Sequence, residues 1–269
     1  MTSEQTRRSE LGDSDQPVED EVADSFDAVV EEGAERLNRT WRAVISTGFS
    51  GGLEIGVGVA AYLAVLHETD SHLLAGLAFS VGLIALLLAH SELFTENFLL
   101  PITALLAKEG TPGQLARLWI GTLAANLVGG LLIMGLFVVA PPDLHGVLAE
   151  SARHYLDVGV GWQGAVLAIL GGMVITLLTR MQQGTESDAV RVVAAVVAAF
   201  LLTGLQLAHS ILDSLLIFGA ILVGRATVGE WIVWFVPVLL LNVVGGLVLI
   251  TLSRLVRSKE LLEQRRRQN

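Results

Sequence analysis

Two short polar elements interrupt the most apolar parts of this sequence and carry its most reactive side chains. His209 and Asp213 lie inside the apolar run 189–223, and His90 and Glu92 lie in the middle of a second such run. Ionisable side chains are costly within a lipid bilayer and usually mark the path of a proton, an ion or a polar substrate. Histidine suits proton exchange because its ordinary pKa of about 6.5 lies in the physiological range. These residues therefore indicate passage or protonation of a small substrate within a membrane.

The same four side chains also admit structural and metal-binding interpretations. Either histidine could be a hydrogen-bonded structural residue. Asp213 and Glu92 could each cap a half-helix by accepting backbone N–H groups, and Asp213 could instead act on His209 by Coulomb attraction. Imidazole and carboxylate groups also suit a divalent ion. A divalent metal channel, or a channel for a neutral small solute, is therefore the main alternative to a path for anions and protons.

The composition is that of a membrane protein. Of the 269 residues, 52% are hydrophobic and 16% are charged, and the mean hydropathy is +0.62. Soluble domains rarely reach this apolar content. Acidic residues crowd the region before Trp41, so the formal net charge of −10 says little about the membrane part. The absence of cysteine excludes disulfides and Cys-ligated metals.

Six apolar segments are each long enough to cross a hydrocarbon core of about 30 Å. The second and the fifth are too long for one crossing, and each carries a polar element in its middle. This pattern predicts helices broken at the midplane, because irregular backbone at that depth is tolerated only where protein buries it or where it lines a cavity. The segments are 44–66, 73–107, 114–140, 162–180, 189–224 and 231–256.

The polar regions define the remaining parts of the chain. Residues 1–17 are expected to form a disordered acidic tail. Residues 18–42 read as an amphipathic helix that either lies against the membrane domain or forms a lid under a pore. The channel domain is expected at 43–257, with a basic tail at 258–269. Lys and Arg concentrate in the loops on the side of both termini, which predicts cytoplasmic termini. The apolar face of the amphipathic helix comprises Val22, Phe26, Val29, Val30, Gly33 and Leu37.

Two matched elements indicate that the chain is an inverted repeat. Asn126 and Asn242 each begin an Asn-x-Val-Gly-Gly element, in the third and the sixth segment. Each follows a His-Ser element, His90 by 36 residues and His209 by 33. A unit of three spans must be inverted in its second copy, and such folds place the substrate site near the midplane between the repeats. The repeats are expected at about 43–140 and 160–256, with Gly130 and Gly246 permitting close helix packing.

Taken together, these motifs resemble the formate/nitrite transporter family over roughly residues 40–255. The resemblance implies an all-α fold of six transmembrane helices in two inverted repeats, aquaporin-like and assembled as a homopentamer. It further implies a channel in the inner membrane of a prokaryote. The motifs that carry it are Phe79-Ser80-x-Gly-Leu83, Glu92-Leu93-Phe94-Thr95, Gly113-Gln114-Leu115-Ala116 with Trp119 and Asn126, and His209-Ser210-Ile211 with Asn242.

The resemblance also assigns roles to residues. His209 would be the central pore histidine. The substrate would be a small monovalent anion or its weak acid, moving with a proton through the lipid bilayer. The sequence does not choose among formate, nitrite, hydrosulfide, acetate and lactate. No enzyme activity, cofactor, bound metal or nucleic acid is implied. By the same resemblance, Phe79, Leu83 and Leu202 form a cytoplasmic constriction, and Leu93, Phe94 and Thr95 form the loop that breaks the second segment.

Departures from the family pattern indicate a divergent branch. His90-Ser91 stands where better-known members have a glycine-alanine pair, and Asp213 stands where they have asparagine. A lysine of their periplasmic vestibule falls on Leu156, with Arg153 and His154 nearby.

The mechanism suggested by these residues concerns desolvation. Moving an anion into a low-dielectric medium costs on the order of 20 kcal/mol in an idealised estimate, far more than moving its neutral acid. We therefore expect His209 to assist protonation, directly or through water, and Thr95 to supply a hydroxyl hydrogen bond. An intramembrane serine hydrolase is a minor alternative, because Gly48-Phe49-Ser50-Gly51 fits a nucleophile motif for which His209 could be the base.

Overall fold

The structure is a computed structural model that describes residues 16–140, 142–257 and 259–268. Most of the expected disordered tail, residues 1–15, lies outside the described residues. Within the described residues every regular element is helical. The elements are α2 (Gln16–Asn38), α3 (Trp41–Thr69), α4 (His72–Leu88), the 3-10 turn η1 (Phe94–Phe98), α5 (Leu100–Leu106), α6 (Pro112–Val139), the 3-10 turn η2 (Pro142–Leu144), α7 (His145–Val158), α8 (Trp162–Gln183), α9 (Asp188–Gly204), α10 (Ser210–Leu222), α11 (Val228–Val244), the π-helical η3 (Gly245–Leu252), α12 (Ser253–Arg257) and α13 (Lys259–Gln268).

Four helical units are long and apolar enough to cross a membrane, namely α3, α6, α8 and the continuous unit of α11 and η3. They correspond to the first, third, fourth and sixth apolar segments. The second segment divides into α4, η1 and α5, and the fifth divides into α9 and α10. The prediction of six apolar segments, with the second and the fifth interrupted, is therefore confirmed.

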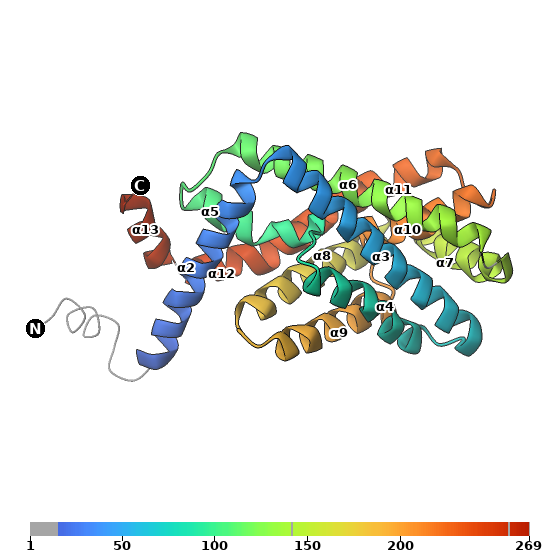
Figure 1. Cartoon of the computed structure of the whole chain (residues 1–269), viewed down its shortest axis with the longest axis horizontal. Coiled ribbons are helices and arrows are strands. Elements are labelled where there is room, and N and C mark those ends of the chain that lie inside the picture. The colour runs from blue at the N-terminus through green and yellow to red at the C-terminus, as the bar shows by residue number, and fades with distance from the viewer. Residues whose placement is uncertain (1–15, 141, 258, 269) are drawn as a thin grey trace, which may run out of the picture.

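The two ends of the molecule are built differently. α2 and α13 lie at one end, and α7 lies at the other (Figure 1). We call these the terminal end and the α7 end. At the terminal end, Arg265 of α13 pairs with Glu109 and Asp27, which ties the expected C-terminal tail to α2. α2 packs on α5, and a Cβ on Gly33 would overlap the backbone oxygen of Leu100. α2 therefore lies against the membrane domain through its apolar face, of which Phe26, Val29, Val30, Gly33 and Leu37 are buried.

The interrupted segments reach opposite ends of the molecule before they return to its centre. α4 begins at the α7 end, where His72 shares a cavity with α7, and ends where Leu88 shares another cavity with α2. α9 packs along α4 in the opposite direction, from the α2 cavity to the α7 cavity. His90 and Gln206 then turn the chain with positive φ angles of 53° and 51°. The breaks are therefore re-entrant loops, one entering from each end.

One asparagine holds the first re-entrant loop. Asn126 of α6 accepts the N–H of Phe94 at 2.8 Å through Oδ1. Its Nδ2 donates to the carbonyl oxygens of Gly48 at 2.7 Å and of Glu92 at 2.8 Å. Unpaired backbone groups are costly away from water, particularly at membrane depth. Asn126 is fully buried and therefore supplies the partners that an irregular loop lacks.

A second asparagine repeats the arrangement in the other half of the chain. Asn242 of α11 accepts the N–H of Ser210 at 2.8 Å. It donates to the carbonyl oxygens of Ala168 at 2.7 Å and of Ala208 at 3.0 Å. The two halves thus contain the same device, with α3, α6 and the first loop matching α8, α11 and the second loop.

These paired contacts correct the register of the repeat. Glu92 corresponds to Ala208, because the carbonyl oxygen of each accepts a hydrogen bond from the matching asparagine, and both stand 34 residues before it. Leu93 is therefore the structural counterpart of His209. The expectation that His90 is that counterpart is wrong, because His90 lies in the turn before the loop. The shared His-Ser dipeptide suggested that His90 is equivalent to His209. The true equivalent, Leu93, lies three residues further along the chain.

The two glycines expected to permit close packing do so. A Cβ on Gly130 would lie 2.6 Å from the Leu215 side chain of α10. A Cβ on Gly246 would lie 2.6 Å from Phe98 of η1 and would overlap the Thr176 hydroxyl. Both glycines therefore let a membrane-crossing helix approach a half-helix or a loop closely.

We predict that Asn242→Ala destabilises the protein strongly. The substitution leaves one buried N–H and two buried carbonyl groups without partners, and an unsatisfied buried group costs about 1–3 kcal/mol. The expected loss of unfolding free energy is at least about 2 kcal/mol, measured by thermal unfolding in detergent. Asn126→Ala should behave alike. Val244→Ala, at a position that is 43% exposed, is the control. Equal melting of the asparagine variants and this control would contradict the role of the asparagines.

Candidate functional site: a buried histidine between two re-entrant loops

The two re-entrant loops meet at one side-chain contact. His209 Nε2 lies 2.9 Å from Thr95 Oγ1, and both residues are buried, at 1% and 0% exposure. Thr95 stands in η1 of the first loop, and His209 caps α10 at the end of the second. The structure thus brings together His209 and the Thr95 hydroxyl, which were predicted from the sequence to act together in the pore.

The backbone fixes which nitrogen of His209 carries the proton. The N–H of Leu212 donates to His209 Nδ1 at 3.2 Å. A nitrogen that accepts a hydrogen bond holds a lone pair, so the proton of the neutral ring sits on Nε2. Nε2–H then donates to Thr95 Oγ1, and the Thr95 hydroxyl keeps its own proton for a further acceptor. Protonating Nδ1 would break the helix cap, because two N–H groups would face each other. The fold therefore favours a neutral His209 that donates towards Thr95.

The Thr95–His209 pair lies within one continuous apolar cluster. Leu93 and Phe94 precede Thr95, and Trp119 packs edge-on against Phe94 with ring centroids 5.8 Å apart. Trp119 Nε1 also donates to the carbonyl of Asn97 at 3.1 Å, which fixes η1. The buried apolar side chains that the sequence nominated all belong to this cluster, namely Phe79, Leu83, Leu93, Phe94 and Leu202.

Two of these residues lie on the other side of the pair from that expected. Leu202 stands two residues before α9 ends at the α7 end. Phe79 stands midway along α4, where its backbone meets Gly58 of α3. The first loop meets α3 at Gly51, which is nearer the start of α3 and the terminal end. Phe79 and Leu202 are thus nearer the α7 end than the Thr95–His209 pair. The expectation of a constriction on the side of the termini is wrong for them, because α4 and α9 run antiparallel past the centre.

His90 and Glu92 both lie outside the centre. His90 is exposed and lines a cavity of about 650 Å³ at the terminal end, together with α2 and Asp188. It does not join His209. Both ring nitrogens of His209 are engaged by Thr95 and Leu212, so Ser50 of α3 has no hydrogen bond from it. The nucleophile-base arrangement of a serine hydrolase is therefore absent from the described residues.

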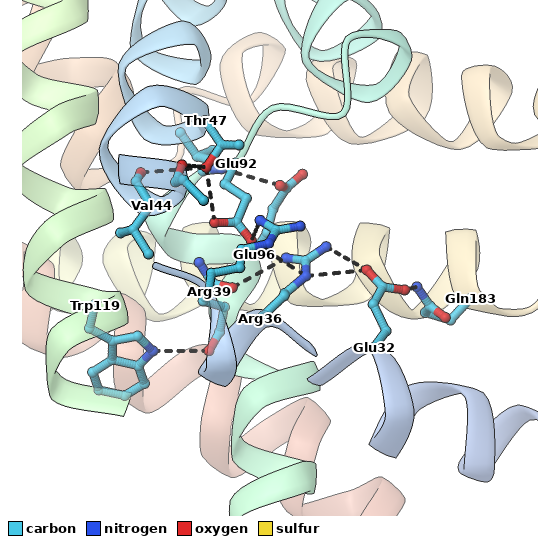
Figure 2. A network of polar contacts seen from close by, with 12 residues as sticks. Glu32, Arg36, Arg39, Val44, Thr47, Glu92, Glu96, Trp119 and Gln183 are labelled. Carbon is cyan, nitrogen blue, oxygen red and sulfur yellow. Dashed lines mark hydrogen bonds and ion pairs between the residues drawn. The ribbon is translucent and has the colours of Figure 1, made fainter. Parts of the chain in front are cut away.

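Glu92 is the centre of an ion-pair network that joins α2 to the first loop (Figure 2). The Glu92 carboxylate is 1% exposed, and its Oε1 lies 2.6 Å from Arg39 Nη1 and 3.5 Å from Arg36 Nε. Arg36 also donates to Asn97 Oδ1 of η1 at 3.2 Å and pairs with Glu32 at 2.7 Å. The network places two guanidinium groups directly beneath the loop that carries Thr95.

The carboxylates differ in their roles at the loops. Glu92 was expected as a possible half-helix cap, but that role belongs to Glu96, whose Oε2 accepts the N–H of Leu93 at 3.3 Å. Asp213 does cap its loop, because Oδ2 accepts the N–H of His209 at 2.7 Å. The sequence analysis assigned no role to Glu96 or to the two arginines, Arg36 and Arg39. Arg36 and Arg39, spaced three apart at the end of an amphipathic helix, were the available signal for an acidic partner.

A smaller cavity of about 120 Å³ opens at the α7 end. His72, His154 and Gln206 line it with Asp70 and Glu150. Burial, and secondly the nearby His72, lower the pKa of His154, which keeps this imidazole neutral at pH 7. The Tyr62 hydroxyl lies 2.9 Å from His72 Nδ1. Within the described residues, no group of three or more His, Asp or Glu side chains is placed to hold a metal ion. His90, Glu92, His209 and Asp213 in particular are not gathered into one site.

An all-helical fold with four membrane-length apolar helices, in which two loops bury a histidine at the centre, is typical of a membrane transporter or channel. A profile described as "Formate/nitrite transporter" matches residues 23–256. The chain belongs to the formate/nitrite transporter family, whose members are transporters rather than enzymes.

Similarity to individual proteins agrees with the family. The "Uncharacterized transporter YrhG" of Bacillus subtilis is 27% identical over 87% of this chain and 90% of its own length. The "Formate channel BtFdhC" of Bacillus thuringiensis is 28% identical over 81% of this chain and 88% of its own length. "Formate channel FocA" of Escherichia coli K12 is 28% identical, over 54% of this chain and 52% of its own length.

Two solved structures share the fold. A "Pentameric formate channel with formate bound" superposes with a TM-score of 0.68 at 21% identity, covering 80% of this chain and 96% of its own. An "FNT family ion channel" superposes with a TM-score of 0.72 at 18% identity, covering 87% of this chain and 98% of its own.

We predict that Glu92→Gln loosens α2. The substitution removes the charge that Arg39 and Arg36 share, and a charge-assisted hydrogen bond contributes about 1.5–3 kcal/mol. Backbone amides of α2 should then exchange hydrogen about tenfold to a hundredfold faster. Glu35→Gln, at an exposed position of the same helix, changes the net charge equally and should leave exchange unaltered. Equal exchange rates in the two variants would show that the network does not hold α2.

Proposed function

We propose that this protein conducts a small monovalent anion of the formate type, or its conjugate acid, across a prokaryotic plasma membrane. The observation that carries the proposal is the buried 2.9 Å contact between His209 and Thr95, at the meeting point of two loops from opposite ends. Family membership and the formate channels among the relatives support this substrate class.

The chemistry of the site suits an anion that becomes neutral on its way. An apolar constriction strongly disfavours a bare anion, whereas a neutral acid passes at much lower cost. The neutral ring of His209 donates to Thr95, and the Thr95 hydroxyl is then free to donate to a substrate oxygen. In this role His209 orients a hydroxyl donor and does not itself give up a proton.

The lining on either side of the pair defines the path. We infer that Leu83, Leu93 and Phe94 narrow it towards the terminal end, while Phe79 and Leu202 narrow it towards the α7 end. All five side chains are buried in the single chain. In this proposal, passage of a substrate requires these buried side chains to move aside.

We further infer a homopentamer with both termini in the cytoplasm. A pentameric formate channel has the same fold, which supports the assembly. Large apolar side chains such as Leu136, 62% exposed, and Val233, 71% exposed, remain on the outside of a single chain, as lipid contacts or subunit contacts require. The bias of Lys and Arg towards the terminal end supports the orientation.

The first prediction of this proposal concerns the pore histidine. His209→Phe should lower formate flux into proteoliposomes at least about tenfold and should alter its pH dependence, because Thr95 loses its hydrogen-bonding partner. Thr95→Val should act in the same direction. His67→Phe, the same substitution at an exposed position at the end of α3, is the control. Unchanged flux and pH dependence in His209→Phe would refute the role assigned to the pair.

The second prediction concerns orientation and uses the absence of native cysteine. Glu186→Cys places a thiol between α8 and α9 at the terminal end, and Glu150→Cys places one on α7; both positions are exposed. A membrane-impermeant maleimide added to spheroplasts should label Glu150→Cys at once and Glu186→Cys only after lysis. The reverse pattern would place the termini outside the cell.

A further inference from the structure

Asp213 is a buried carboxyl group beside the pore histidine, and the cap that it forms uses only half of it. The residue is 0% exposed, and its Oδ2 accepts the N–H of His209 at 2.7 Å. Its second oxygen, Oδ1, makes no hydrogen bond of standard geometry to the described residues. A cap alone needs one acceptor oxygen, which an asparagine would also supply. The ionisable second oxygen therefore calls for a separate explanation.

Among the residues that the structure describes, Asp213 has hydroxyl groups but no paired cation in its surroundings. α10 packs against α3, α6, α7 and α11. α7 contributes Tyr155, whose hydroxyl hydrogen-bonds to the Asp213 carboxyl group, and α3 contributes Tyr62, which is near enough to feel the charge of Asp213. α11 contributes Trp231, which donates to Ser214 Oγ at 2.9 Å, and Asn242, which accepts the N–H of Ser210 at 2.8 Å. Among the described residues, no Lys or Arg is paired with Asp213 from any of these helices.

A chain of titratable side chains leads from Asp213 to the α7 end. Tyr155 hydrogen-bonds to Asp213, and Tyr62 is near enough to Tyr155 for the two phenols to affect each other electrostatically. The Tyr62 hydroxyl lies 2.9 Å from His72 Nδ1, and His72 lines the cavity of about 120 Å³ that opens at that end. Hydroxyl and imidazole groups both accept and donate protons. The series can therefore pass a proton between the cavity and the buried carboxyl group through neutral side chains.

We propose that Asp213 takes up a proton from the cavity at the α7 end, through Tyr155 and the Tyr62–His72 pair, and that an anion occupies the constriction beside His209 only while Asp213 holds this proton. The inference rests on the proposed function, because it requires that an anion uses this path. It assigns to one side chain the coupling between proton uptake and anion passage.

The proton balance is simple. Tyr155 gives its hydroxyl proton to Asp213 Oδ1 and regains one from Tyr62, and Tyr62 is replenished through His72 from water in the cavity. One proton leaves the outer solution, and one carboxylate becomes one neutral carboxylic acid. The Oδ2 cap on His209 is kept throughout, so the loop does not have to rearrange.

Electrostatics explains why anion occupancy depends on this proton. Two unit negative charges about 6 Å apart, in an effective dielectric constant of about 20, reduce joint occupancy by about a hundredfold. No neighbouring cation offsets the charge of Asp213 within the described residues. A neutral Asp213 removes the repulsion while leaving the site dry and the histidine in place.

The test compares Asp213→Asn with the unmodified protein in proteoliposomes loaded at a fixed inner pH. The amide oxygen can still cap His209, but the side chain no longer titrates. Formate uptake is measured at outer pH values from about 5 to about 8, and the ratio of variant to wild-type flux is taken at each pH. Both proteins meet the same concentration of formic acid, so the protonation of the substrate cancels in the ratio. We expect the ratio to rise with outer pH, by up to about tenfold per pH unit above the pKa of a single titrating group.

The outcomes separate this inference from the proposed function. A measurable flux in both proteins with a ratio independent of outer pH overturns the role of Asp213 and leaves the anion channel standing. Absence of formate flux from both proteins at every pH overturns both proposals. In a second series the outer pH is fixed and the inner pH is varied, and a ratio that changes with the inner pH in that series overturns the path through the α7 end.

A second variant keeps the inference testable if Asp213→Asn does not assemble. Tyr155→Phe retains the ring and the carboxyl group and removes only the hydroxyl that contacts Asp213. After a rapid change of outer pH, formate flux should reach its new value at least about tenfold more slowly than in the unmodified protein. Phe218→Tyr, which adds a hydroxyl to the same helix as Asp213 at a partly buried position, should respond at the normal rate. A normal response in Tyr155→Phe overturns the relay.

Discussion

The structure depends on one constraint, which is that irregular backbone inside a bilayer must find hydrogen-bond partners within the protein. Two loops re-enter the centre of this molecule, and each is satisfied by a single buried asparagine from a neighbouring membrane-crossing helix. Close approach is needed for these bonds, and a Cβ at Gly51 or at Gly171 would overlap the loop carbonyl that the asparagine also binds. The same arrangement of an asparagine and a facing glycine therefore holds both loops, with Asn126 and Gly51 at the first and Asn242 and Gly171 at the second.

The two loops are held by matching backbone contacts, but they present different side chains to the centre. The position equivalent to His209 in the first loop is Leu93, so only one loop brings a titratable group to the centre. The first loop is instead tied by Glu92 to Arg36 of α2 and to Arg39, which follows α2, at the terminal end. The second is tied by Asp213 to Tyr155 of α7. Each end of the path therefore acts on the central pair through a different loop and a different kind of bond, ion pairs at one end and hydroxyl groups at the other.

The sequence was sufficient for the features that depend on composition and on local pattern. Six apolar segments, the interruption of two of them, the family, and the meeting of His209 with Thr95 all followed from it. Register did not, because the His-Ser dipeptides resembled each other while the equivalence is set by backbone carbonyls, 34 residues before each asparagine. The side on which Phe79 and Leu202 lie depends on α4 and α9 passing the centre before they turn, which hydropathy does not reveal. The pairing of Glu92 with Arg36 and Arg39 joins segments far apart in the chain, and no local pattern encodes it.

The helix cap at His209 links folding to the chemistry of the pore. His209 can accept the N–H of Leu212 only while Nδ1 is unprotonated. Protonation of the ring would therefore also destabilise the loop. A simple proton shuttle through this ring would have to break the cap in each cycle. A neutral donor to Thr95, with the mobile proton held elsewhere, leaves the loop intact. Asp213 suits that task, since it bonds to the N–H of His209 through Oδ2 and its other oxygen is not needed for the cap. The cap therefore separates two roles: His209 orients the Thr95 hydroxyl, and the Asp213 carboxyl group binds and releases the proton.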